Sequence, residues 1–323
     1  MKLIARAEQW PLAEVFTISR GSRTETELVT VELSDGELVG HGECMANPRY
    51  NETQEGVLAT LNDLDLASGL DQDCLQELLP AGAARNALDC ALWDLEAKRS
   101  GMRVWEMAGL QPPGSVITAF TLSLDTPERM GALAKQHADR PLLKLKVTGE
   151  GDFERVAAVR EGAPNARLIV DANEGWNADI VEPLSDQLRT LGVEMIEQPL
   201  PAEKDAVLAD LVHPVPLCAD ESCHNSADLA QLKGRYEIVN IKLDKTGGLT
   251  EALKVKREAY NLGFRVMVGC MVATSLAMAP AHLVAQGAAY VDIDGPLLLA
   301  RDRRFGLSYE GSRVEPPDTT LWG

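Results

Sequence analysis

Residues 238–261 read IVNIKLDKTGGLTEALKVKREAYN, a short apolar run (Ile238–Leu243) followed by a Gly-Gly pair and a helical stretch (Thr250–Asn261). An apolar strand followed by a helix is the repeating unit of parallel α/β folds. The same unit recurs in the last two thirds of the chain. The other apolar, β-rich runs are Val116–Leu124, Leu142–Val147, Arg167–Val170, Met195–Ile196, Val215–Cys218, Arg265–Val268 and Tyr290–Ile293. Eight runs at roughly 25-residue spacing predict a (β/α)8-type barrel.

A doubly wound open sheet is the alternative fold, but no Gly-x-Gly-x-x-Gly follows any of the runs. The first third of the chain has a different pattern. Residues Glu27–Leu38 alternate up to a Ser-Asp-Gly turn, as antiparallel strands do, and Ala83–Arg99 has helical spacing. Because Gln111–Gly114 has the composition of a linker, we expect an α+β domain over 1–112 and the barrel over 113–296.

The composition argues against several classes of protein. The 323 residues carry 31 Lys and Arg against 49 Asp and Glu, a net charge of −18, and no segment concentrates basic side chains. We therefore expect no nucleic-acid partner, and an anionic membrane would repel the chain. The uncharged stretch Val266–Val291 is interrupted by Gly, Ser, Thr and His, which favours a buried strand and helix over a membrane span. Six scattered cysteines without a Cys-x-x-Cys pair are typical of reduced thiols in a cytoplasmic protein.

Acidic side chains follow three consecutive runs. Asp171, Glu197 and Asp220 stand at the carboxyl ends of the third, fourth and fifth runs. In a parallel barrel these ends meet on one face, where active sites lie. Three converging carboxylates repel one another unless a cation lies between them, and oxygen ligands favour a hard ion such as Mg²⁺. The pattern therefore predicts a magnesium site.

Three lysines accompany these acids. Lys144 and Lys146 end the second run and share a strand face, and Lys242 lies in the sixth run, across the barrel. Two close ammonium groups beside a cation lower each other's pKa, which would yield a neutral amine able to remove a proton near pH 7. Two opposed lysines around a metal suit removal of the α-proton of a bound carboxylate from one face and reprotonation at the other.

These motifs resemble those of the enolase superfamily, muconate-lactonising subgroup, and within it the dipeptide epimerases. Lys-x-Lys, Asp-x-Asn, Glu-Gln-Pro, Asp-Glu-Ser and Ile-Lys-Leu-Asp-Lys-Thr-Gly-Gly-Leu occur in the family's order, and the resemblance covers essentially the whole chain. It implies a (β/α)7β modified TIM barrel under an N-terminal capping domain that residues 297–323 complete. It also implies one Mg²⁺ per subunit, held by Asp171, Glu197 and Asp220, with Lys146 and Lys242 as acid/base catalysts and Lys144 as an electrostatic helper. We expect Lys245, three residues after Lys242, to turn away from this site.

The resemblance also implies the substrate contacts. Asp292 and Asp294 match an Asp-x-Asp that receives a dipeptide's α-ammonium group, and Arg23, preferred over Arg20, would pair with a glutamate side chain. The implied reaction inverts the α-carbon of a dipeptide's C-terminal residue, L-Ala-D-Glu to L-Ala-L-Glu, in murein peptide recycling. Further candidate contacts are Arg49, Tyr50, Asn173, Cys270, Thr274 and Ser275.

Two alternatives remain open at this point. One is another enzyme of the subgroup, an o-succinylbenzoate synthase or an N-acyl amino acid racemase, although neither would need two anions at positions 292 and 294. The other is a non-catalytic barrel that only binds a ligand. Barrels of this kind often self-associate, so a homo-oligomer is a further expectation.

Overall fold

The computed structural model describes residues 1–66 and 69–323. The N-terminal region forms a three-stranded antiparallel sheet in the order β1 (Lys2–Ile18), β2 (Gly21–Asp35), β3 (Leu38–Cys44). The helices that follow are α1 (Gln54–Asn62), α2 (Gln72–Leu78), α3 (Ala83–Ser100) and α4 (Val104–Met107). Helix α3 lies directly on β3: a Cβ added at Gly42 would stand 2.0 Å from the Ala87 carbonyl oxygen, so only glycine fits there. The predicted meander and the predicted helix over 83–99 are both confirmed.

The second region is the barrel. In the described part of the chain, eight parallel strands pair in the order β12-β11-β10-β9-β8-β7-β6-β5. A backbone hydrogen bond from Ala119 N to Val291 O (2.7 Å) joins the two ends of this row, beside β5 and β12. The strands are β5 (Phe120–Leu122), β6 (Leu142–Lys146), β7 (Arg167–Asp171), β8 (Val193–Glu197), β9 (Leu217–Ala219), β10 (Ile238–Ile241), β11 (Arg265–Gly269) and β12 (Tyr290–Asp292). Each contains part of one predicted run.

One run behaves differently from the expectation. The stretch expected as a single strand over 116–124 divides into β4 (Val116–Ile117) and β5, and only β5 joins the barrel. β4 instead pairs with β14 (Arg313–Val314), which also pairs with β13 (Tyr309–Glu310). Local pattern could not predict this, because β14 comes from the far end of the sequence.

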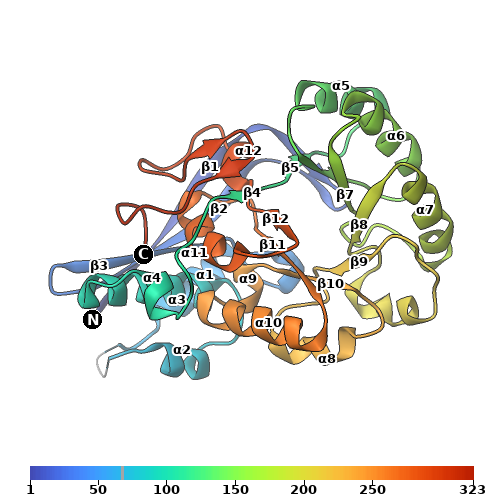
Figure 1. The fold of residues 1–323 in the computed structure, drawn as a ribbon. Coiled ribbons are helices and arrows are strands. Elements are labelled where there is room, and N and C mark those ends of the chain that lie inside the picture. Colours follow the sequence, from blue (N-terminus) through green and yellow to red (C-terminus); the bar gives the residue numbers. More distant parts are fainter. Residues whose placement is uncertain (67–68) are drawn as a thin grey trace.

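Helices surround the barrel (Figure 1). They are α5 (Pro127–Gln136), α6 (Asp152–Gly162), α7 (Ala178–Thr190), α8 (Leu229–Leu232), α9 (Leu243–Thr246), α10 (Leu249–Leu262) and α11 (Ser275–Ala285), with 3₁₀ segments at Ala202–Ala209 and Ser226–Asp228; a further 3₁₀ segment, Pro48–Tyr50, belongs to the N-terminal region. Among the described residues, the one helix after β12 is the short α12 (Gly295–Leu298). The eighth unit therefore lacks a full helix, as the resemblance implied, and the fold is a (β/α)7β barrel with an N-terminal capping region.

The C-terminal tail returns to the capping region (Figure 1). Trp322 is fully buried, and its indole Nε1 donates to Cys90 O on α3 (2.9 Å). Arg103 Nε donates to Gly323 O (2.6 Å) just before α4. These contacts favour a division into 1–112 with 297–323 and 113–296, which we retain as a proposal.

The barrel interior is apolar from the amino ends to the middle of its strands. One buried cluster takes a residue from or beside each strand: Ala119, Leu142, Ile169, Met195, Cys218, Ile238, Met267 and Tyr290. The polar side chains described below lie toward the opposite, carboxyl end. The uncharged stretch Val266–Val291 contains β11, α11 and the start of β12, and within residues 1–66 and 69–323 no helix has the length and apolar character needed to cross a membrane.

Candidate active site

Strand register places the first polar residues side by side. Lys146 on β6 pairs in register with Asp171 on β7, and Asp171 pairs with Glu197 on β8. Lys144 and Lys146 share a face of β6 because they are two residues apart. Asp220 follows β9, and Lys242 follows β10 directly. Because β6 and β10 lie four strands apart in an eight-stranded ring, Lys146 and Lys242 approach from opposite sides.

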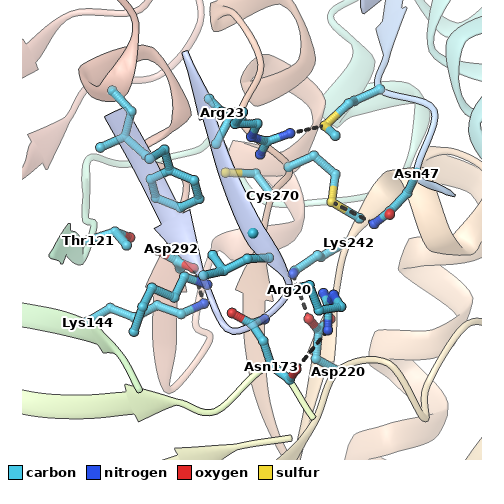
Figure 2. Close-up of a pocket in the computed structure, with 18 of the residues that line it drawn as sticks. Arg20, Arg23, Asn47, Thr121, Lys144, Asn173, Asp220, Lys242, Cys270 and Asp292 are labelled. Carbon is cyan, nitrogen blue, oxygen red and sulfur yellow. Dashed lines mark hydrogen bonds and ion pairs between the residues drawn. The ribbon is translucent and has the colours of Figure 1, made fainter. Parts of the chain in front are cut away.

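A cavity of about 270 Å³ opens at this end of the barrel, under the cap. Figure 2 shows Arg23 and Asn47 on one side of it and Lys144, Lys242, Asp220 and Asp292 on another. The cap contributes Phe16, Ile18, Arg20, Gly21, Ser22, Arg23, Met45, Asn47, Pro48 and Tyr50 to the lining. The barrel contributes Thr121, Lys144, Lys146, Asn173, Asp220, Glu221, Lys242, Cys270, Met271, Val272, Asp292 and Asp294, and the C-terminal segment contributes Leu298.

Lys144 is the most enclosed of the three predicted lysines. Its Nζ lies 2.7 Å from Asp292 Oδ2 and 2.7 Å from Glu197 Oε2. Asp171 Oδ2 is 3.1 Å away. Burial alone would lower the pKa of this ammonium group, but the three carboxylates raise it well above its ordinary range. The lowering of the Lys144 pKa expected beside a bound cation stays a prediction, since carboxylates outnumber lysines around Lys144 here.

The two lysines predicted to exchange protons each contact one carboxylate. Lys146 Nζ donates to Asp171 Oδ2 (2.6 Å), and Lys242 Nζ donates to Asp220 Oδ2 (2.7 Å). Both side chains are largely buried yet line the cavity. Burial alone would lower the pKa of Lys242, but the nearby carboxylates, Asp220 first, raise it. Both ammonium groups are thus held beside the space that a ligand would occupy.

The three strand-end carboxylates (Asp171, Glu197 and Asp220) have the chemistry of a hard-cation site. All are buried, and Glu197 Oε2 and Asp220 Oδ1 accept no hydrogen bond of good geometry from the described residues. Lysine ammonium groups stand 2.7 Å from both oxygens instead. In the described part of the chain, no group of three His, Cys, Asp or Glu side chains is arranged to hold a metal as it stands. The donor set fits a divalent cation, provided that the cavity-lining lysines Lys144, Lys146 and Lys242 give up contacts with these acids.

A second pair of acids lies at the end of β12. Asp292 Oδ2 accepts from Lys144, and its Oδ1 has no hydrogen-bond partner among the described residues. Asp294 Oδ2 accepts from the backbone N–H of Thr121 (2.7 Å). Burial, together with the charge of Asp292, raises the pKa of Asp294 to about 7. Two adjacent carboxyl groups that line a cavity form a site suited to a cation such as an ammonium group.

The two arginines of the β1–β2 loop region have different surroundings. Arg20 makes ion pairs with Glu221 (2.9 Å) and Glu174 (3.3 Å) and donates to Asn173 O (2.9 Å). Arg23 lies 3.7 Å from the sulfur of Met45, and none of the described carboxylates pairs with it. Burial lowers its pKa without compensation from a nearby acid. Arg23 is therefore the guanidinium free to receive an anion in the cavity.

Three of the weaker candidates lie elsewhere or are already engaged. Arg49 is outside the cavity lining, and its guanidinium binds Glu174 through two contacts (2.6 and 2.8 Å). Thr274 donates its hydroxyl to buried Glu43 (2.6 Å), and Ser275 donates to Asp302. The structure does not place these three residues in the cavity lining, because each polar group is held at a contact between segments far apart in sequence, and their role as ligand contacts stays a prediction.

The remaining weaker candidates do line the cavity: Tyr50, Asn173 and Cys270. Asn173 Oδ1 has no hydrogen-bond partner in the described part of the chain. Lys245 corrects another expectation. It lies on α9, and its Nζ is 2.7 Å from Asp220 Oδ1 rather than turned away, because the helix, unlike a strand, brings it back toward the site.

Sequence reasoning missed several lining residues. Glu221 is buried, lines the cavity and follows Asp220 directly, so its position in the Asp-Glu-Ser motif was the available signal. The apolar lining from Phe16, Met45 and Leu298 had no such signal. These residues come from three distant segments, and only the packing of cap on barrel brings them together.

Two protein-family models match the chain. The family model for the mandelate racemase/muconate lactonizing enzyme N-terminal domain matches residues 1–109. The enolase C-terminal domain-like model matches residues 129–319.

Relatives with assigned activities resemble most of the chain. An L-Ala-D/L-Glu epimerase of Escherichia coli K12 is 48% identical over 91% of this chain and 93% of its own length. An N-acetyl-D-glutamate racemase of a Pseudoalteromonas species is 44% identical over 92% of this chain and 95% of its own length.

Solved structures show the same fold. An enolase family member of Agrobacterium tumefaciens with homology to dipeptide epimerases, with sodium and L-Ala-L-Glu bound, superimposes with a TM-score of 0.98 at 54% identity, covering 99% of both chains. A dipeptide epimerase of Methylococcus capsulatus, in complex with Mg and L-Arg-D-Lys, has a TM-score of 0.90 at 32% identity, covering 98% of this chain and 97% of the other. With both family models matched, the chain belongs to the mandelate racemase/muconate lactonizing enzyme family of the enolase superfamily.

Proposed function

We propose that this protein is a Mg²⁺-dependent dipeptide epimerase that interconverts L-Ala-D-Glu and L-Ala-L-Glu by proton transfer at the glutamate α-carbon. The observation that carries the proposal is the opposed pair Lys146 and Lys242 on either side of one cavity. Inversion of a carbon centre needs one base on each face of the same carbon, and an opposed pair supplies both. Relatives that resemble nearly the whole chain include an L-Ala-D/L-Glu epimerase.

The three strand-end carboxylates would hold the ion. One Mg²⁺ bound there supplies the positive charge that makes an α-proton beside a carboxylate acidic. Lys144 lies within reach of two of these carboxylates and of Asp292, so its ammonium group stands at the edge of the ion site. Its fixed positive charge then favours the negative charge that develops when the proton leaves.

The two opposed lysines, Lys146 and Lys242, would transfer the protons. One of them, as a neutral amine, takes the α-proton, while the other, as an ammonium group, returns a proton to the opposite face. The configuration inverts and the protein ends with the same number of protons. The reverse reaction exchanges the two roles. Both lysines must first leave the carboxylates they contact here, Asp171 and Asp220.

The rest of the dipeptide would be held at its two charged ends. Asp292 and Asp294 would bind the α-ammonium group of the first residue, and Arg23 would pair with the glutamate side chain. Arg23 has no carboxylate partner among the described residues, and a buried guanidinium without a counter-ion favours an anionic side chain such as that of glutamate. We further propose a cytoplasmic role in murein peptide recycling, consistent with a D-Glu-containing substrate and six free cysteines.

An N-acyl amino acid racemase is the second candidate, since an N-acetyl-D-glutamate racemase is 44% identical over 92% of the chain. The same lysines and Arg23 could act on N-acetylglutamate. Its acetyl group carries no positive charge, however, and would leave Asp292 and Asp294 facing a neutral amide. Ionised Asp292 and Asp294 would then be buried without a cation from the ligand beside them, which raises the free energy of the complex. The same reasoning disfavours an o-succinylbenzoate synthase.

Proton NMR in deuterated buffer tests the proposal. With L-Ala-L-Glu and Mg²⁺ we expect loss of the glutamate α-proton signal and growth of the other diastereomer, and a chelator should stop both. N-acetyl-L-glutamate in a parallel sample should exchange much more slowly. If the α-proton of N-acetyl-L-glutamate exchanged faster than that of L-Ala-L-Glu, the protein would be an N-acyl amino acid racemase instead.

Substitution of one lysine tests the two-base assignment. We expect Lys146→Ala to reduce epimerisation by about 10²-fold or more, because one face of the α-carbon loses its base. Circular dichroism should remain that of the parent protein. Lys256→Ala is the control, because this lysine lies on α10 outside the cavity lining. Epimerisation in both directions by the Lys146→Ala variant would refute the assignment.

A further inference from the structure

Lys245 is a fourth buried lysine near the site, and the reaction described above does not use it. Its side chain is completely shielded from solvent, and it does not line the cavity. Its Nζ lies 2.7 Å from Asp220 Oδ1, and it donates to two main-chain carbonyls, Asp220 O (2.5 Å) and Asn240 O (2.9 Å). An ammonium group has three N–H donors, and three oxygens surround this one.

These contacts join two neighbouring strand ends. Asp220 follows β9, Asn240 belongs to β10, and Lys245 lies on the short helix α9 that follows β10. Lys245 therefore holds both the main chain and the side chain of Asp220. A buried ammonium group with three oxygen partners resists displacement, because each broken contact leaves a charge unsatisfied away from water.

Two hydrogen bonds connect Lys245 to Glu197 through Asn240. The Asn240 side chain donates through Nδ2 to Glu197 Oε1 (2.7 Å), while its main-chain carbonyl accepts from Lys245. One ammonium group thus supports two of the three strand-end carboxylates, Asp220 directly and Glu197 through Asn240. Lys245 supports both carboxylates from outside the cavity, since it is not one of the lining residues.

The two lysines on Asp220 have different tasks. Lys242 lines the cavity and contacts Oδ2, whereas Lys245 lies behind and contacts Oδ1. Lys242 must leave Asp220 to exchange a proton with a substrate. Because Lys245 stays, the carboxylate keeps its orientation when that contact is lost.

We propose that Lys245 is a positioning residue that presents Asp220 and, through Asn240, Glu197 for divalent-cation binding. This proposal rests on the magnesium site of the proposed function. It assigns no proton transfer to Lys245. It predicts that loss of Lys245 weakens cation binding more than it slows the chemical step.

The test is calorimetric titration of Mg²⁺ into full-length, substrate-free protein. We expect Lys245→Met to weaken Mg²⁺ binding by about 10- to 100-fold, the usual effect of removing a group that orients a metal ligand. Activity should fall at low Mg²⁺ and recover in large part at saturating Mg²⁺. Unchanged Mg²⁺ affinity in a folded Lys245→Met variant would overturn the proposal.

Lys256→Met is the matched control. Lys256 also donates to two main-chain carbonyls, Val284 O (2.8 Å) and Gln286 O (2.5 Å), but it stands away from the cavity. We expect Lys256→Met to lower stability without changing Mg²⁺ affinity. An equal loss of affinity in both variants would mean that the effect is general destabilisation and would also overturn the proposal.

Asn240→Ala keeps the test decisive if Lys245→Met does not fold. This change removes the contact with Glu197 and leaves the main-chain carbonyl that Lys245 binds. It should weaken Mg²⁺ binding, and unchanged affinity would overturn the proposed support of Glu197 through Asn240.

Calorimetry needs no turnover, so the two proposals can fail separately. A parent protein that binds Mg²⁺ but does not exchange the dipeptide's α-proton refutes the proposed function alone. A parent protein that binds no Mg²⁺ refutes both.

Discussion

At the scale of single residues, the environment of a charge decides its role more than its position in the sequence. Arg20 lies in the turn between β1 and β2, Arg23 lies three residues later on β2, and both line the cavity. Arg20 is neutralised by Glu221 and holds Asn173 O, whereas Arg23 has no carboxylate partner among the described residues. The first ties the cap to the barrel, and the second remains available for a ligand.

This difference predicts that one substitution has a substrate-selective effect on kcat/KM and the other does not. Arg23→Met should lower kcat/KM for L-Ala-L-Glu by about 10- to 100-fold, since a hydrogen bond to a charged group contributes about 1.5–3 kcal/mol. It should change kcat/KM for the neutral dipeptide L-Ala-L-Met much less. Arg20→Met should lower both values alike, because it loosens the cap rather than a substrate contact. If Arg20→Met instead lowered kcat/KM for L-Ala-L-Glu alone and Arg23→Met did not, Arg20 would be the substrate contact and Arg23 would not.

At the scale of secondary-structure elements, the cap depends on close approach of α3 to β3. Added Cβ atoms at Gly40 and Gly42 would each stand 2.0 Å from a carbonyl oxygen of α3, those of Ala91 and Ala87. Contacts this short force backbone movement. The two glycines therefore fix how near the helix lies to the sheet, and with it the position of the loop that follows β3.

Gly42→Ala should therefore destabilise the protein. We expect a loss of about 1–3 kcal/mol in the free energy of unfolding, the usual range for overpacking a tight interface. Urea denaturation followed by circular dichroism measures it. Gly114→Ala is the control, since no atom lies within 4 Å of a Cβ added there. Equal midpoints for both variants would show that α3 can move away from β3 without cost.

At the scale of the whole molecule, buried acids hold the cap to the barrel. Asp244, next to Lys245, accepts hydrogen bonds from Met45 N (3.0 Å) and Asn86 Nδ2 (2.8 Å) of the cap. Asp89 on α3 accepts from the N–H (3.0 Å) and the hydroxyl (2.6 Å) of Thr250 in the barrel. Burial raises the pKa of Asp244 from 3.8 to about 7 and that of Asp89 from 3.8 to about 6.

These shifts make stability depend on pH. A carboxyl group whose pKa is higher in the folded state binds its proton more tightly there, so it stabilises the fold at low pH. For Asp244 that stabilisation is lost as pH rises from about 4 through about 7, when the buried group must ionise. Asp244→Asn keeps an oxygen acceptor without a charge. We expect this variant to gain stability relative to the parent protein at pH 8 but not at pH 4.

Urea denaturation of both proteins at pH 4, 6 and 8 checks this. The difference between variant and parent should grow across the series. Asp71→Asn is a useful control, because Asp71 is an exposed helix cap whose pKa is lowered rather than raised. A difference between Asp244→Asn and the parent that is constant with pH would contradict the prediction.

Much of the fold followed from local pattern. The eight apolar runs, the helices at 83–99 and 250–261, and the acids and lysines at strand ends were all readable, because strand and helix periods and the shared end of a parallel barrel are local properties. The seven-helix variant of the barrel came only through the family resemblance. The division of the run over 116–124 was not readable, because β4 pairs with a strand nearly two hundred residues away.

The sequence alone therefore determined which residue types stand at the mouth of the barrel and in what order. Only the tertiary structure decided which charges are free and which are already paired. Arg49, Thr274 and Ser275 look like ligand contacts in sequence but bind Glu174, Glu43 and Asp302 in the fold. Lys245 looked irrelevant and holds Asp220. The physical reason is that pairing depends on distances between segments far apart in the chain, and these arise only when the cap packs on the barrel.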